Sequence, residues 1–103
     1  MSIKIVVFNN GNQVISDVKE VIIEDKCQAY KLTKPQNVSL KEFKHELLTE
    51  EQTSDAVEMV LSAWVPLAKE QTFYVAMNSV ISIAEPVDEL VKIYKEKVGE
   101  IDD

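Results

Sequence analysis

Few residues in this sequence have the chemistry of a catalytic nucleophile or base. The 103 residues include one cysteine, Cys27, and one histidine, His45. A nucleophilic pair needs these two side chains within hydrogen-bond reach, whereas a lone buried cysteine and a helix-face histidine are common structural residues. The 18 acidic residues show no spacing typical of an acid–base pair. We therefore expect no catalytic residues and no enzyme activity.

Cofactor and metal sites are not expected either. The only glycines, Gly11 and Gly99, cannot form a glycine-rich phosphate loop. One histidine and one cysteine cannot form a metal-ligand cluster unless carboxylates supply the remaining ligands. The single cysteine excludes an internal disulfide and favours a reducing compartment. Because the apolar runs are too short to span a membrane and no signal-peptide pattern begins the chain, we expect a cytoplasmic protein with no membrane partner.

The charged residues limit the ways in which this protein could bind nucleic acid. All 11 basic residues are lysine, and with 18 acidic residues the net charge is −7. Arginine is the usual residue for bidentate phosphate recognition, so capture of nucleic acid by the whole molecule is not expected. Residues 26–45 carry +4 and residues 46–89 carry −8. This division predicts a local basic face, complementary faces that meet between subunits, or chance segregation on a solvated surface.

Strand patterns dominate residues 3–84. Residues 3–8 are rich in β-branched side chains and end at Asn9-Asn10-Gly11-Asn12, a strong hairpin signal. The returning strand, residues 13–24, changes its apolar face near residues 18–21, which predicts a bend or bulge. Further strands are expected at residues 27–39, with a break or edge at Pro35, at 58–68, and at 72–84, with a tight turn or kink at Asn78-Ser79.

Residues 39–57 are predicted to form an insertion between the third and fourth strands. Ser39-Leu40-Lys41-Glu42 fits a capping box at the start of a short helix. Leu40, Phe43, Leu47 and Leu48 would line that helix, and residues 50–55 would form an exposed acidic loop.

A second helix is predicted at residues 86–98. Pro86 suits its first position, acidic residues occupy its first turn, lysines occupy its last turn, and Gly99 can cap it. We expect its apolar stripe to lie against the sheet, although a stripe of this kind can also bind a partner. The stripe consists of Val87, Leu90, Val91, Tyr94 and Val98. With no repeat or linker, residues 1–103 form a single predicted domain.

Trp64 and Pro66 lie on the less apolar side of the predicted fourth strand. Two interpretations remain open for them. They pack beneath the C-terminal helix or the insertion, or Trp64 anchors an interface, where tryptophan is enriched.

Two segments resemble the motifs of the Sm-like (LSm) family, and the likeness covers about residues 3–84. The first motif, an apolar strand, a turn glycine and an alternating strand, resembles residues 6–18. The second motif resembles residues 75–83, although its arginine and glycine fall at Ala76 and Met77. The usual glycine of strand two falls at Ser16. The nearest likeness is to small Sm-like proteins of marine phages, of the cyanophage type.

This resemblance implies a mainly β fold. The expected structure is a small, strongly bent, five-stranded antiparallel open barrel of the Sm-like, SH3-like type, with a C-terminal α-helix and the short helical insertion. An open barrel leaves unpaired strand edges, and Sm-like proteins pair strand four of one subunit with strand five of the next. Such head-to-tail contacts generate a ring if the rotation between subunits closes. The expected interface residues are Met59, Leu61, Ala63, Val65, Phe73 and Val75.

The resemblance also implies a binding site for single-stranded RNA at the ring pore. The RNA-contacting loop is echoed at residues 25–28, and the arginine that helps to hold a uridine base is replaced by Ala76. The pore residues would be Asp25, Lys26, Gln28, Met77 and Asn78. We therefore expect a homo-oligomeric ring that binds RNA through a degenerate site. The alternative is a structural or protein-binding ring of phage origin, working in the host cytoplasm.

Overall fold

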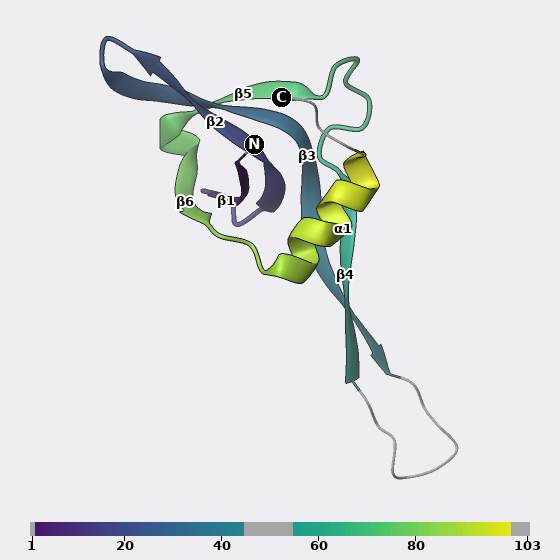
Figure 1. Ribbon diagram of the computed structural model, residues 1–103. Helices are drawn as coiled ribbons and strands as arrows, with labels where there is room; N and C mark the ends of the chain where they lie inside the picture. The colour runs from purple at the N-terminus through teal and green to yellow at the C-terminus, as the bar shows by residue number, and fades with distance from the viewer. Residues whose placement is uncertain (1, 45–54, 100–103) are drawn as a thin grey trace, which may run out of the picture.

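The computed structural model describes residues 2–44 and 55–99. Strands make up most of this part of the chain, and every strand pairing is antiparallel. Figure 1 shows the elements in order: β1 (Ile3–Phe8), β2 (Gln13–Ile23), β3 (Lys26–Lys44), β4 (Asp55–Ala63), β5 (Thr72–Ala76), the 3-10 helix η1 (Met77–Ser79), β6 (Val80–Ala84) and α1 (Asp88–Val98).

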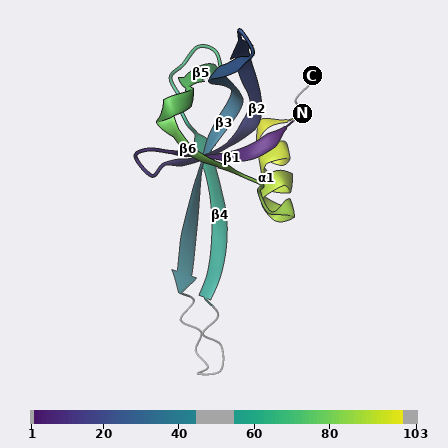
Figure 2. The same cartoon turned by 90° about the vertical axis from the view of Figure 1, so that its left-hand side faces the viewer.

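The strands form one curled sheet in the order β4-β3-β2-β1-β6. Strand β3 is long enough to pair with two partners on the same side. Its first part pairs with β5 from Ala29 to Thr33, and its second part pairs with β4 from Gln36 to Lys44. The sheet is therefore five strands wide, and it curls into an open barrel with α1 on its outer side (Figures 1 and 2). This confirms the predicted bent open barrel with a C-terminal helix.

The strands bend at local irregularities. The register of β2 on β3 shifts between Ile15 and Asp17 and again between Val21 and Ile22, on either side of the predicted change of face. In β3, Lys34 has a φ of 52° and precedes Pro35, whose ring removes a backbone donor. Beyond this point β3 leaves β5 and continues along β4. The resulting β3–β4 hairpin extends beyond the barrel as an arm (Figure 2).

Two apolar clusters lie on opposite faces of the sheet. The inner cluster fills the barrel and has as its buried residues Val6, Phe8, Val14, Val18 and Leu32. The outer cluster lies between the sheet and α1 and has as its buried residues Ile15, Leu61, Leu90 and Tyr94. Adjacent residues of β2, such as Val14 and Ile15, thus serve different clusters, as the two-residue period of a strand requires.

The predicted helical insertion is wrong where the structure describes it. Residues 39–44 continue β3, from Ser39 opposite Val60 to Lys44 opposite Asp55. The long β4 partner offers a backbone ladder, and this tertiary pairing outweighs the local capping-box signal at Ser39. The rest of the predicted insertion, including His45, Leu47 and Leu48, lies outside the described residues.

Other sequence predictions need smaller changes. The predicted fourth strand ends at Ala63 instead of residue 68. The predicted kink at Asn78-Ser79 is confirmed, because η1 separates β5 from β6. Leu90, Tyr94 and Val98 of the predicted stripe lie against the sheet. Val87 does not, because α1 begins at Asp88 and leaves Val87 64 % exposed at its N-cap. Within residues 2–44 and 55–99, no helix is long and apolar enough to cross a membrane.

Trp64 packs inside the protein, as the first interpretation expected, but on the barrel side instead of beneath α1. Its ring stacks on Phe8 with centroids 5.3 Å apart and meets Phe73 edge-on at 5.5 Å. Aromatic pairs favour both arrangements. Trp64 therefore closes the inner cluster next to the loop that connects β4 to β5, while Pro66 is exposed in that loop.

Candidate functional site

The five predicted pore residues lie at the β2–β3 turn and at η1. Strand β3 contacts η1, and the β3–β5 ladder ends with Ala29 opposite Ala76, which brings Gln28 to the level of Met77 and Asn78. Lys26 lies two residues before Gln28 in β3, about 7 Å away at the rise of a strand. The structure thus brings three of the five residues together and places Asp25 and Lys26 at the projecting tip of the turn.

The backbone of the β2–β3 turn explains its sequence. Glu24 and Asp25 have φ values of 53° and 64°, in the left-handed region that aspartate tolerates better than most residues. The side chains of Asp25, Lys26 and Gln28 are all exposed. The tip therefore offers an exposed carboxylate, ammonium and amide to a ligand.

Asn9 holds η1 in place and was not predicted as a site residue. Its Nδ2 donates to the Asn78 carbonyl at 2.8 Å, and its backbone N–H donates to the Ser79 carbonyl at 3.0 Å. Ser79 Oγ donates to the Ala76 carbonyl at 2.6 Å. The sequence showed Asn9 only as part of an Asn-Gly turn, because its partners lie about 70 residues away. Asn9 fixes the backbone that presents Met77 and Asn78.

The six predicted interface residues do not form two complementary edges. Strands β4 and β5 pair along the same side of β3, so Met59, Leu61 and Ala63 share one edge of the sheet with Phe73 and Val75. Leu61 is buried in the outer cluster and Met59 packs against that cluster, whereas Val75 packs against the inner cluster. Val65 lies in the β4–β5 loop. The opposite edge of the sheet is β6.

Exposed apolar side chains mark both edges. Tyr74 on β5 is 66 % exposed, and Ile81 on β6 is 64 % exposed. Met77, at η1 between these strands, is 46 % exposed. Among the described residues, β5 pairs only with β3 and β6 pairs only with β1. Each of these strands thus presents a free backbone edge beside an exposed apolar side chain.

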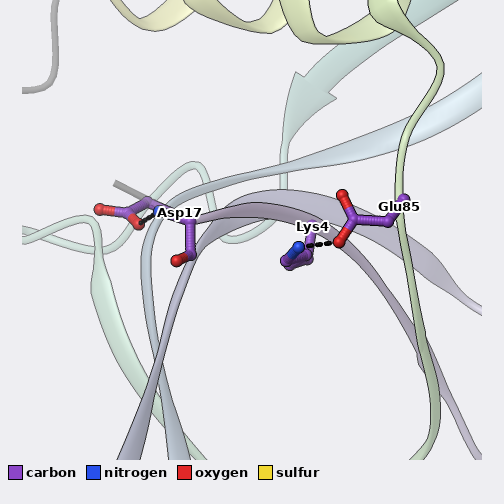
Figure 3. Close-up of polar contacts among 4 residues, drawn as sticks. Lys4, Asp17 and Glu85 are labelled. Atoms are coloured by element: carbon purple, nitrogen blue, oxygen red, sulfur yellow. Dashed lines mark hydrogen bonds and ion pairs between the residues drawn. The ribbon is translucent and has the colours of Figure 1, made fainter.

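A hollow of about 530 Å³ opens beside β6. Its apolar lining comes from Val18, Tyr30 and Ile83, and Lys4, Lys19 and Glu20 also line it. Lys4 forms an ion pair with Glu85, which ties β1 to the segment before α1 (Figure 3). Burial raises the pKa of the Tyr30 hydroxyl, and the nearby Cys27 and Glu20 raise it further. These features describe an open barrel mouth with mixed lining.

Within residues 2–44 and 55–99, no three histidine, cysteine, aspartate or glutamate side chains lie close enough together to bind a metal ion. Cys27 Sγ lies 3.6 Å from the Ala29 carbonyl, and its hypothetical partner His45 lies outside the described part.

No curated protein matches the sequence. A family model described as a family of unknown function, DUF6561, matches residues 1–99. Because this match covers nearly the whole sequence, the chain belongs to the DUF6561 family.

Proposed function

We propose that this protein assembles head to tail into an Sm-like homo-oligomeric ring that binds single-stranded RNA at its pore and has no catalytic role. The observation that carries the proposal is the pair of free strand edges, β5 on one side of the open barrel and β6 on the other. The sequence predicts that the fourth and fifth predicted strands form the contact between subunits. In this proposal β6 takes the place of the fourth predicted strand.

The two edges suit each other in length and chemistry. Each strand has five residues, and each carries an exposed apolar side chain, Tyr74 or Ile81. An aromatic side chain next to a β-branched one is a favourable cross-strand pair. Pairing β5 of one copy with β6 of the next would satisfy the open backbone groups of both edges. Because the two edges differ, the contact repeats from copy to copy and closes when the rotation allows.

The RNA site of this proposal consists of Gln28, Met77 and Asn78, with Lys26 and Asp25 at the nearby tip. The amides of Gln28 and Asn78 can donate to and accept from base edges, and Met77 offers exposed apolar surface. Ala76 supplies no donor. Lys26 is the only cation of the five residues, so binding to one subunit should be weak and should fall as salt screens the phosphates.

Assembly is tested by multi-angle light scattering on the purified protein. We expect a defined oligomer for the wild type and a shift to monomer for Ile81→Glu, because a charge on an edge strand opposes pairing. Leu67→Glu is the matched control, since Leu67 is 97 % exposed in the β4–β5 loop and lies off both edges. A wild type that stays monomeric at high concentration contradicts the proposal.

RNA binding is tested by fluorescence anisotropy with a short oligouridine at 50 mM salt, on protein whose oligomer is intact. We expect Asn78→Ala and Lys26→Gln to weaken binding and Lys92→Gln, on the exposed side of α1, to leave it unchanged. No binding by an intact oligomer would remove RNA from the proposal.

The absence of arginine, the net charge of −7 and the alanine at residue 76 favour a second candidate. It is a structural or protein-binding ring, of phage origin by the resemblance, that assembles without nucleic acid. The ratio of absorbance at 260 nm to that at 280 nm, read across the oligomer peak, distinguishes the two. A protein-like ratio together with recovery of a specific protein supports this second candidate, and excess absorbance at 260 nm from bound RNA counts against it.

A further inference from the structure

A row of three side chains crosses the outer face of the barrel. Lys19 on β2 lies directly opposite Lys31 on β3, and Lys31 lies directly opposite Tyr74 on β5. Directly opposed residues in an antiparallel ladder point to the same face. The adjacent row, which consists of Val18, Leu32 and Phe73, contains the buried Val18 and Leu32 of the inner cluster. The row of Lys19, Lys31 and Tyr74 therefore faces outward.

The two lysines of this row are an unfavourable pair in the protein alone. Like charges directly opposite each other destabilise a sheet, and no ion pair among the described residues involves Lys19 or Lys31. The nearest acidic residue along β2 on this side, Asp17, is buried and accepts a hydrogen bond from the Ser2 backbone N–H at 3.0 Å (Figure 3). Glu20 lies opposite Tyr30, in a row of the other face. Lys19 and Lys31 thus lie side by side without an ion pair among the described residues, and the acidic residue next to Lys19 in the chain, Glu20, lines the hollow beside β6 together with Lys19.

Tyr74 adds an exposed aromatic ring at the end of the two charges. Its side chain is 66 % exposed. The next outward row consists of Val21, Ala29 and Ala76, whose short side chains leave space beside the tyrosine ring. Lysines that contact phosphates, next to an aromatic ring on which a base stacks, are the combination that binds single strands without reading their sequence.

We propose that this outer row is a binding surface for single-stranded nucleic acid, with phosphates on Lys19 and Lys31 and a base stacked on Tyr74. The surface shares no residue with the pore site, so it does not depend on RNA binding there. It shares Tyr74 with the β5 edge of the proposed ring, and light scattering on the Tyr74 variants therefore separates lost stacking from lost assembly. An acidic protein segment would use the two lysines but would gain little from a stacking ring, and the exposed tyrosine therefore favours a nucleic acid.

The test measures the affinity of the full-length protein for labelled oligouridine and oligodeoxythymidine over a range of salt concentrations. Tyr74→Leu keeps apolar bulk at the β5 edge but removes the aromatic face, and we expect it to weaken binding about 5- to 150-fold. Tyr74→Phe keeps the ring and should bind like the wild type. Light scattering on both variants shows whether assembly is unchanged.

The charges are tested separately with the double variant Lys19→Gln/Lys31→Gln. The logarithm of the affinity falls as the logarithm of the salt concentration rises. The loss of two phosphate contacts should make this fall shallower, by about 1.4 in the slope. Lys69→Gln/Lys92→Gln removes the same charge from exposed positions elsewhere and should leave the slope unchanged. The proposal is overturned if Tyr74→Leu and the lysine double variant bind like the wild type, or if the row binds a polyglutamate peptide as tightly as either oligonucleotide.

The results separate this surface from the proposed function. Loss of binding in the row variants but not in Asn78→Ala supports the row and rejects the pore site. Loss of binding in Asn78→Ala but not in the row variants supports the pore site and rejects the row. Binding that depends on the row in a protein that is monomeric overturns the ring and leaves the row standing.

Discussion

The two faces of the curled sheet are stabilised in different ways. The inner cluster is closed by strands and by the aromatic contacts of Trp64 with Phe8 and Phe73. The outer cluster is covered by one helix, and its largest member, Tyr94, also makes hydrogen bonds. The Asp17 N–H donates to Tyr94 Oη at 3.2 Å, and the single hydroxyl proton is shared between the Thr33 and Lys34 carbonyls, whose oxygens each lie 3.0 Å from Oη.

This difference shows how a short helix can be held on a strongly bent sheet. The Tyr94 hydroxyl binds backbone groups next to the Ile15–Asp17 register shift in β2 and next to Lys34 in β3. Irregular backbone leaves polar groups that need partners. One hydroxyl therefore fastens α1 to both bends, while the inner cluster depends on apolar packing.

The largest effect should come from removing buried volume on either face. Leu32→Ala should lower the free energy of unfolding by about 3–5 kcal/mol, because strands surround Leu32 and cannot collapse into the cavity. Leu90→Ala should cost about 2–3 kcal/mol, since α1 can shift towards the sheet. Urea unfolding at one fixed protein concentration measures both values. A larger loss for Leu90→Ala would reverse the comparison.

Tyr94→Phe should cost about 1–3 kcal/mol, because it leaves the buried Asp17 N–H without an acceptor while the ring still packs. Thermal or urea unfolding near pH 7 measures the loss. Tyr30→Phe is the control on the inner face, because the Tyr30 hydroxyl has the Cys27 side chain as its partner and satisfies no buried backbone group among the described residues, and it should change stability little. Equal losses in the two variants would mean that the Tyr94 hydrogen bonds do not matter.

Alkaline pH should weaken the outer face selectively. Burial raises the pKa of the Tyr94 hydroxyl to about 12, and the charge of Asp17 adds to the rise, from an ordinary value of 10.0. The pKa of this hydroxyl is higher in the folded protein than in the unfolded chain. The protonated hydroxyl therefore contributes its full share of the free energy of unfolding below pH 10, and this contribution is lost as the pH rises towards 12. A rise of the pKa from 10.0 to about 12 corresponds to about 2.7 kcal/mol, and solvent screening lowers the loss below that value. The stability difference between wild type and Tyr94→Phe should shrink across this range, and a constant difference would refute the assignment.

The smallest effect is expected at the β1–β2 turn, which belongs to neither cluster. Gly11 has a φ of 88°, and an added Cβ would meet no atom within 4 Å. Gly11→Ala should therefore cost only the backbone strain, about 1 kcal/mol. Thermal unfolding measures it, with Asn12→Ala as a neighbouring control, because Asn10 Oδ1 accepts a hydrogen bond from the Asn12 N–H at 3.0 Å and is needed in the turn, whereas the Asn12 side chain makes no hydrogen bond to the described residues. A cost above that of Tyr94→Phe would show that the turn contributes more than its own conformation.

Features with local causes could be predicted from the sequence. The Asn-Gly hairpin, the bend of β2, the kink at Asn78-Ser79 and the apolar stripe of α1 each depend on neighbouring residues, and each is present. The open barrel was predicted from the order of such features together with the family resemblance.

Features set by long-range pairing could not be predicted. The capping-box pattern at Ser39 is a real local signal, but β4 pairs with the same residues and makes them a strand. The assignment of the barrel edges depends on β3 pairing with both β4 and β5 on one side. The hydrogen bonds from Asn9 to η1 and the row of Lys19, Lys31 and Tyr74 depend on register between distant segments. The pattern of apolar residues in the sequence does not specify which residues of two distant strands lie opposite each other.

The arm formed by β3 and β4 gives the molecule a length that is independent of its core. Beyond Met59, which packs against the outer cluster, the ladder continues outward to Lys44 opposite Asp55, and each further residue pair advances about 3.4 Å. Pairs could be added or deleted there without changing either cluster. Related chains could thus differ in how far they reach from the same barrel, and the arm could carry a fused peptide at a chosen distance from its surface.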